Sequence, residues 1–230
     1  MLEELKERVC RANLRLAADG LVVLTWGNVS GIDRQAGLVV IKPSGLPYAG
    51  MTAEHMVVIS LADGTVVEGS LRPSSDTPTH LELYRTWKYV GGIAHTHSLF
   101  ATAWAQACTE IPPLGTTHAD TFHGPVPCTR KLTPKEIAGD YEANTGKVIL
   151  ERFSRVNPAH VPGVLVAEHG PFAWGDDPQG AAEHALVLEH VARLAGESLR
   201  IRPNLAPIQA ELLDKHFLRK HGPGAYYGQG

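Results

Sequence analysis

The stretch GGIAHTHSLF, residues 91–100, decides what fold and what chemistry to expect of this chain. An apolar run leads into it, two histidines two positions apart end that run, and an apolar helical pattern follows. Side chains at positions i and i+2 of a strand point to the same face, so His95 and His97 project together, about 6.6 Å apart along the chain. Their nitrogens can converge on one metal ion at roughly 2.0–2.1 Å. The stretch therefore predicts a buried strand that ends in part of a metal site.

A third histidine stands in a similar context. The segment GVLVAEHG, residues 163–170, has the composition of a strand and places His169 at a strand-to-loop junction. Three histidines with an open fourth position are the arrangement of a catalytic zinc site. An H-x-H pair alone also fits two histidines that are hydrogen-bonded at a sheet edge, and the third histidine favours the metal.

Composition limits the class of protein. The chain has 230 residues, with 43% hydrophobic residues, 20% charged residues and a net charge of −3, which predicts one soluble domain over residues 1–230. Two small domains are also compatible with that length. The mixed charge gives no reason to expect a nucleic acid or a membrane as partner, and no apolar run approaches the roughly 20 residues of a membrane helix. The start is charged and unlike a secretory signal, and the three cysteines, Cys10, Cys108 and Cys128, form no obvious pairs. These features predict a cytoplasmic protein.

Alternating and helical patterns predict the remaining elements. Hairpins are expected early in the chain and helices alternate with strands later. The expected hairpins span 28–45, with a turn at 34–37, and 55–70, with a turn at 63–64; strands are expected at 90–95 and 163–170; helices are expected at 2–18, 75–89, from 98 onward, 133–154, 178–201 and 206–220. This order predicts an α/β fold in which helices cover both faces of a central, mostly antiparallel or mixed sheet.

Seven motifs together resemble the class II aldolase/adducin superfamily, and within it the branch of the L-ribulose-5-phosphate 4-epimerases. The H-x-H pair and the distal histidine are typical of the superfamily, whereas the SSD triplet, the HAD segment and the AYYGQ ending point to the epimerase branch. The resemblance runs from near the first helix to the end of the chain. The motifs are TWGNVSG, IKPSG, RPSSDTPTH, GGIAHTHS, THADTFHG, EHGPFAWG and DKHFLRKHGPGAYYGQ.

The resemblance implies a metal site and a phosphate site. It implies that His95, His97 and His169 bind Zn²⁺, for which Mn²⁺ or Co²⁺ can substitute, and that Asp76 is an additional ligand or a close neighbour. It also implies that the substrate phosphate is held by Asn28, Lys42, Ser44, Gly45, Ser74 and Ser75. Small hydroxyls, glycine amides and one ammonium suit a phosphate dianion, although each of these loops is also a common turn sequence.

The implied reaction converts L-ribulose 5-phosphate to D-xylulose 5-phosphate in pentose catabolism, serving arabinose or ascorbate use. No carbonyl is adjacent to C4, so inversion proceeds by cleavage and re-formation of the C3–C4 bond. The resemblance assigns proton transfer on the two faces of C4 to Asp120 and Tyr227, supplied by the neighbouring subunit of a homotetramer. Among the supporting residues, His216 and Arg219 of the last helix would support the substrate, and Thr116 and Glu142 would support Asp120 or the subunit interface.

Other functions compete with this interpretation. A class II aldolase acting on fuculose or rhamnulose 1-phosphate would carry a glutamate where this chain has Asp76, and a methylthioribulose-phosphate dehydratase should lack the AYYGQ ending. A non-catalytic, adducin-like interaction module would not need the complete set of histidines. Asp120 alone would read as a helix or turn cap, and His118 and His123 as loop or interface histidines.

Overall fold

The computed structural model describes residues 2–226, and its secondary structure follows the expected order. Hairpins occupy the first part of the chain, and the longest helix lies near the end. The helices are α1 (Glu3–Ala18), α2 (Thr77–Thr86), α3 (Leu99–Gln106), α4 (Thr116–Ala119), α5 (Pro134–Ala138), α6 (Tyr141–Arg152), α7 (Pro178–Ile201) and α8 (Ala210–His221), with a 3₁₀ turn, η1 (Ala53–His55). Within these residues no helix is both long and apolar enough to cross a membrane.

One sheet organises the part of the chain that is described. It has seven strands in the order β4-β3-β2-β1-β5-β7-β6, and every neighbouring pair is antiparallel. The strands are β1 (Asn28–Asp33), β2 (Leu38–Ile41), β3 (Val57–Ser60), β4 (Val66–Glu68), β5 (Gly92–His95), β6 (Gly163–Leu165) and β7 (Pro171–Gly175).

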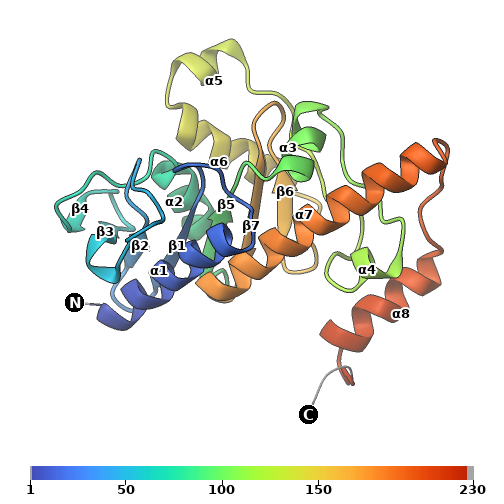
Figure 1. The fold of residues 1–230 in the computed structure, drawn as a ribbon, viewed down its shortest axis with the longest axis horizontal. Helices are drawn as coiled ribbons and strands as arrows, with labels where there is room; N and C mark the ends of the chain where they lie inside the picture. Colours follow the sequence, from blue (N-terminus) through green and yellow to red (C-terminus); the bar gives the residue numbers. More distant parts are fainter. Residues whose placement is uncertain (1, 227–230) are drawn as a thin grey trace.

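Helices cover both faces of this sheet, as predicted. Because side chains alternate along a strand, Val29, Ala94 and Ala173 face one side and pack against α1 and α7, which lie in front of the strands in Figure 1. The opposite face carries the larger core, in which Ile93 and Trp174 pack with α2. Alanines on the first face let the long helix α7 lie close to the sheet.

Two expected elements are divided. The helix predicted over 133–154 is two helices, because Gly139 leaves the helical conformation and Asp140 precedes a new start at Tyr141. The strand predicted over 163–170 ends at Leu165, and the chain turns back through Glu168, which has a φ of 62°, into β7. His169 therefore lies in a hairpin turn, rather than at the end of a strand.

The ends of two helices also differ from expectation. Helix α2 ends at Thr86 instead of continuing to 89, and α8 begins at Ala210 instead of 206. The guanidinium of Arg34 donates hydrogen bonds to the backbone oxygens of Tyr84, Trp87 and Val90, which binds the chain leaving α2 to the β1–β2 turn. A side chain 50 residues away thus stabilises this helix end, a contact that local sequence does not reveal.

Candidate active site

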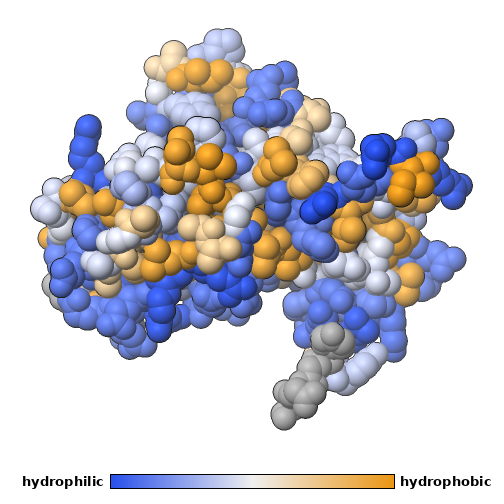
Figure 2. All heavy atoms as spheres, in the orientation of Figure 1, coloured by the Kyte–Doolittle hydropathy of each residue, from blue (hydrophilic) through white to orange (hydrophobic). Residues whose placement is uncertain are grey.

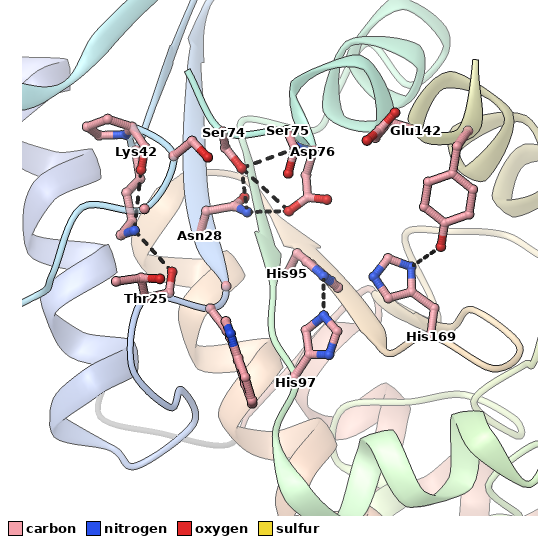
Figure 3. Close-up of a pocket in the computed structure, with 16 residues that line it drawn as sticks. Thr25, Asn28, Lys42, Ser74, Ser75, Asp76, His95, His97, Glu142 and His169 are labelled. Carbon is pink, nitrogen blue, oxygen red and sulfur yellow. Dashed lines mark hydrogen bonds between the residues drawn. The ribbon is translucent and has the colours of Figure 1, made fainter. Parts of the chain in front are cut away.

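A pocket of about 520 Å³ opens where β1 and β5 lie side by side. Figure 3 shows Lys42 at one end and the three histidines at the other, with Asn28, Ser74 and Asp76 between them. Residues far apart in sequence meet here: its walls are formed by Thr25, Trp26, Gly27, Asn28, Lys42, Pro43, Ser44, Gly45, Ser74, Ser75, Asp76, His95, His97, Tyr141, Glu142 and His169.

The three histidines form one end of the pocket, where they could together hold a metal ion. One ring nitrogen from each of His95, His97 and His169 lies within 4.8 Å of the other two, and Nε2 of His95 is 3.1 Å from Nε2 of His97. The carbonyl oxygen of Pro171 is 2.9 Å from Nδ1 of His95. A carbonyl only accepts, so Nδ1 carries the proton and Nε2 keeps its lone pair for a metal. Such an oxygen behind the ring is typical of metal-ligating histidines.

Burial keeps two of these imidazoles neutral. It lowers the pKa of His169 to about 3, with further lowering from His95 and His97, and it also lowers the pKa of His97. A metal ligand must offer a lone pair, so neutral rings are the form required. Three convergent imidazoles fit Zn²⁺, which takes nitrogen ligands in a tetrahedral arrangement and in catalytic sites keeps one position for water or substrate.

Asp76 supplies negative charge beside the histidines. It precedes α2 and accepts a hydrogen bond of 2.7 Å from Nδ2 of Asn28. Burial raises its pKa, but His95, His80 and the hydrogen bond from Asn28 outweigh burial, so the net pKa is lowered. An ionised carboxylate in this position favours a cation nearby. Within residues 2–226 the convergent ligand group consists of the three histidines, and Asp76 stands beside it.

The opposite end presents a buried cation. Lys42 is 1% exposed, and its Nζ contacts the backbone oxygens of Thr25 at 3.3 Å and Pro43 at 3.4 Å and lies 4.8 Å from the ring centre of Tyr48. Burial lowers its pKa to about 8. Among residues 2–226 no carboxylate forms an ion pair with it. A buried ammonium without a counter-charge is costly, so this end is suited to receive an anion.

Two loops that line the pocket contain a glycine in the left-handed conformation. Gly27 has a φ of +81°, and a Cβ there would lie 2.8 Å from the carbonyl oxygen of His95. The loop before β1 can therefore pass against the metal-binding strand only with glycine at this position. Gly45, with a φ of +68°, forms the turn that brings Ser44 to the pocket.

The residues expected to transfer protons lie elsewhere in the chain. Asp120 directly follows α4. Its carboxylate oxygens lie 2.9 Å from Nδ1 of His216, 3.0 Å from Nη2 of Arg219 and 3.2 Å from Nζ of Lys220, and these three residues all belong to α8. Burial raises the pKa of the Asp120 carboxyl group, but the hydrogen bonds from these three side chains outweigh burial, so the net pKa is lowered. We call these four residues the Asp120 cluster. None of them lines the pocket within residues 2–226.

Among the other predicted residues, Thr116 begins α4, beside the Asp120 cluster, and Tyr227 lies outside the described residues. Glu142 lines the histidine end of the pocket, so within this chain it is not beside Asp120. The predicted metal and phosphate residues thus come together, whereas the proton-transfer group stands apart. The sequence analysis did not name five of the pocket residues as site residues, and four of these stand inside the motifs TWGNVSG and IKPSG, which was the available signal. The five are Thr25, Trp26, Gly27, Pro43 and Tyr141, of which Tyr141 is outside the motifs.

In an antiparallel sheet, a pocket with three convergent histidines at one end and a buried lysine at the other is suited to a metal ion and an anionic ligand. The chain belongs to the family described as Class II Aldolase and Adducin N-terminal domain, whose model matches residues 7–195.

Named relatives narrow this further. The chain is 57% identical over 228 residues to an L-ribulose-5-phosphate 4-epimerase, UlaF, of Salmonella paratyphi A, covering 99% of this chain and 100% of that protein; the same values hold for UlaF of Salmonella typhi. Among solved structures, an L-fuculose 1-phosphate aldolase is 25% identical with a TM-score of 0.78, over 93% of this chain and 94% of that chain. YgbL from Klebsiella pneumoniae, 23% identical with a TM-score of 0.71 over 94% and 99%, shares the fold.

Proposed function

We propose that this chain is an L-ribulose-5-phosphate 4-epimerase that inverts C4 by retro-aldol cleavage and re-addition. One observation carries the proposal: a single pocket holds three convergent imidazoles at one end and, at the other, a buried lysine that forms no ion pair with a carboxylate among residues 2–226. A ketose phosphate has the matching pair of groups, namely oxygens able to bind a metal and a terminal dianion. The 57% identity to relatives of that name over 99% of the chain supports the same substrate.

The chemistry follows from where the ketone is. Since C4 has no adjacent carbonyl, breaking C3–C4 lets the C2 ketone take up the electrons as an enediolate. Zn²⁺ held by His95, His97 and His169 would act as a Lewis acid that stabilises the developing negative charge, and Mn²⁺ or Co²⁺ can replace it. Asp76 holds Asn28 at the centre of the pocket and balances the metal charge.

The phosphate end keeps the departing fragment in place. Lys42, with Asn28, the hydroxyls of Ser44, Ser74 and Ser75, and Gly45, would hold the phosphate of glycolaldehyde phosphate while its aldehyde turns over. Bond re-formation on the other face of the aldehyde then gives D-xylulose 5-phosphate.

Proton transfer at the C4 hydroxyl oxygen is assigned to Asp120 and Tyr227 of a neighbouring copy in a homotetramer, with His216, Arg219 and Thr116 holding Asp120. The absence of the Asp120 cluster from the pocket of its own chain supports a shared site. Exposed apolar side chains in the segment that leads to the pocket residue Trp26 support it too: Val23, Leu24 and Trp26 are 55%, 76% and 53% exposed. Figure 2 shows apolar side chains gathered above α1, and such patches mark protein interfaces.

The proposal includes a cytoplasmic location, in keeping with three free cysteines at Cys10, Cys108 and Cys128. Arabinose and ascorbate catabolism both use this reaction and both remain within the proposal.

The test is an assay of zinc-loaded protein with L-ribulose 5-phosphate. Formation of D-xylulose 5-phosphate supports the proposal. The likeness to a fuculose 1-phosphate aldolase favours a parallel assay for cleavage of L-fuculose 1-phosphate. Cleavage of that sugar without epimerisation of L-ribulose 5-phosphate would make the chain an aldolase, and inactivity on both would overturn catalysis on these sugars.

A further inference from the structure

The hydroxyl of Tyr141 contacts the third histidine of the metal-binding end. Its oxygen lies 3.3 Å from Nδ1 of His169, and the centres of the two rings are 6.1 Å apart with a tilt of 36°. Figure 3 shows this contact as the dashed line on the side of His169 that faces away from His95. The other ring nitrogen, Nε2, is thereby left on the side of the remaining histidines.

The backbone fixes where this phenol lies. Tyr141 is the first residue of α6, directly after the break at Gly139. The carbonyl oxygen of Glu142 accepts a 2.6 Å hydrogen bond from Oγ1 of Thr79, which ties the start of α6 to α2. The two helices pack so closely that a Cβ on Gly146 would lie 2.7 Å from Cβ of Glu82. The backbone that carries the phenol is therefore held against α2 beside the pocket.

The tautomer of His169 decides which atom donates the hydrogen bond in this contact. An imidazole that offers Nε2 to a metal carries its proton on Nδ1, and that proton needs an acceptor. His95 has the carbonyl of Pro171 for this purpose, at 2.9 Å. His169 has the phenol oxygen of Tyr141. The first acceptor is backbone and no substitution removes it, whereas the second is a single hydroxyl.

We propose that Tyr141 is a positioning residue for His169: its oxygen holds the imidazole with Nδ1 protonated and Nε2 directed to the metal. This inference rests on the proposed function, since it presupposes a divalent ion bound by the three histidines.

The test is Tyr141→Phe, which keeps the ring and removes only the hydroxyl. Zn²⁺ affinity is measured on the metal-free protein by competition with a chromophoric chelator, and thermal unfolding is recorded with and without Zn²⁺. Loss of a group that orients a ligand typically weakens metal binding about 10–100-fold, and we expect that loss here. The metal-free protein should unfold at the parental temperature, and the added stability from Zn²⁺ should shrink. Tyr89→Phe is the matched control, because Tyr89 is 47% exposed and does not line the pocket.

Parental Zn²⁺ affinity in Tyr141→Phe would overturn the inference. So would a lowered unfolding temperature of the metal-free variant that accounts for the affinity loss, because the tyrosine would then act through packing. Nitrogen NMR of the zinc-loaded parent is a second readout that needs no variant: a protonated Nδ1 on His169 supports the inference and a protonated Nε2 overturns it. If the parent itself binds no Zn²⁺ at the histidines, the proposed function fails instead.

Discussion

The pocket and the Asp120 cluster differ in whether their charged side chains have partners of opposite charge among residues 2–226. In the pocket, a buried lysine at one end has no carboxylate partner among residues 2–226, and neutral imidazoles converge at the other. In the cluster, one carboxylate is held by three groups from α8 within 3.2 Å. Figure 1 shows α4 and α8 together at one end of the molecule, away from β2–β4.

This difference in charge pairing indicates that the pocket is suited to bind ligands, whereas the Asp120 cluster is not. The pocket is organised to receive a cation and an anion, and its unpaired groups cost stability until ligands arrive. In the Asp120 cluster the carboxylate is already paired with side chains of α8. The proposed shared site would bring the cluster of one copy to the pocket of another. Four predictions test the roles of the two regions, and one of them tests the sharing.

The largest effect is expected for His97→Asn. Removing one of three ligands should remove most of the bound metal and lower epimerase activity by roughly 10⁴-fold, because metal stabilisation of developing charge is worth several kcal/mol. Elemental analysis and the epimerase assay measure both. Stoichiometric metal in this variant would show that His97 is not a ligand.

Asp120→Asn should lower the epimerisation rate by about 10²–10⁴-fold while metal content stays parental, as expected for a lost proton-transfer group. Co-expression of Asp120→Asn with His97→Asn then tests the shared site. In mixed tetramers about a quarter of the sites join an intact pocket to an intact Asp120, so activity should recover to that fraction. Mixtures no more active than the separate variants would place both regions in one copy.

Lys42→Met should raise KM for L-ribulose 5-phosphate by about 10–100-fold with a smaller change in kcat, because a charge-assisted contact is worth roughly 1.5–3 kcal/mol. Steady-state kinetics measure the two constants. If both constants match those of the parent, Lys42 does not hold the phosphate and the loop serves only as a turn.

The smallest effect concerns pH. With a pKa of about 8, Lys42 in the free enzyme loses its proton as pH rises past 8, so kcat/KM should fall on the alkaline side and Lys42→Met should lose this dependence. The free energy of unfolding should change with pH in the direction opposite to kcat/KM. Between about pH 8 and the ordinary value of 10.5 the unfolded chain binds more protons at Lys42, so its contribution to the unfolding free energy rises with pH. A pH–rate profile flat to pH 9.5 would contradict the assigned role.

Regular patterns predicted most of the fold. Alternation and the Asp63-Gly64 turn predicted the second hairpin, and the histidine spacing predicted that the side chains of His95 and His97 lie together. Prediction failed where a turn used an unexpected residue: Glu168 takes a left-handed conformation that favours glycine, so the hairpin holding His169 looked like one strand. Tyr141 was missed because a tyrosine at a helix start has no signature until the break at Gly139 is known.

The close approach of Gly27 to the backbone of His95 fixes how the strands on the two sides of the pocket are spaced. The strand that begins with Asn28 is hydrogen-bonded in register with the strand that ends at His95, and the loop before it rests on the His95 carbonyl. Backbone hydrogen bonds thus set how far the backbone beside Lys42 lies from the backbone at His95. Under the proposed function, this spacing would select sugar phosphates by the number of carbons between the phosphate and the carbonyl.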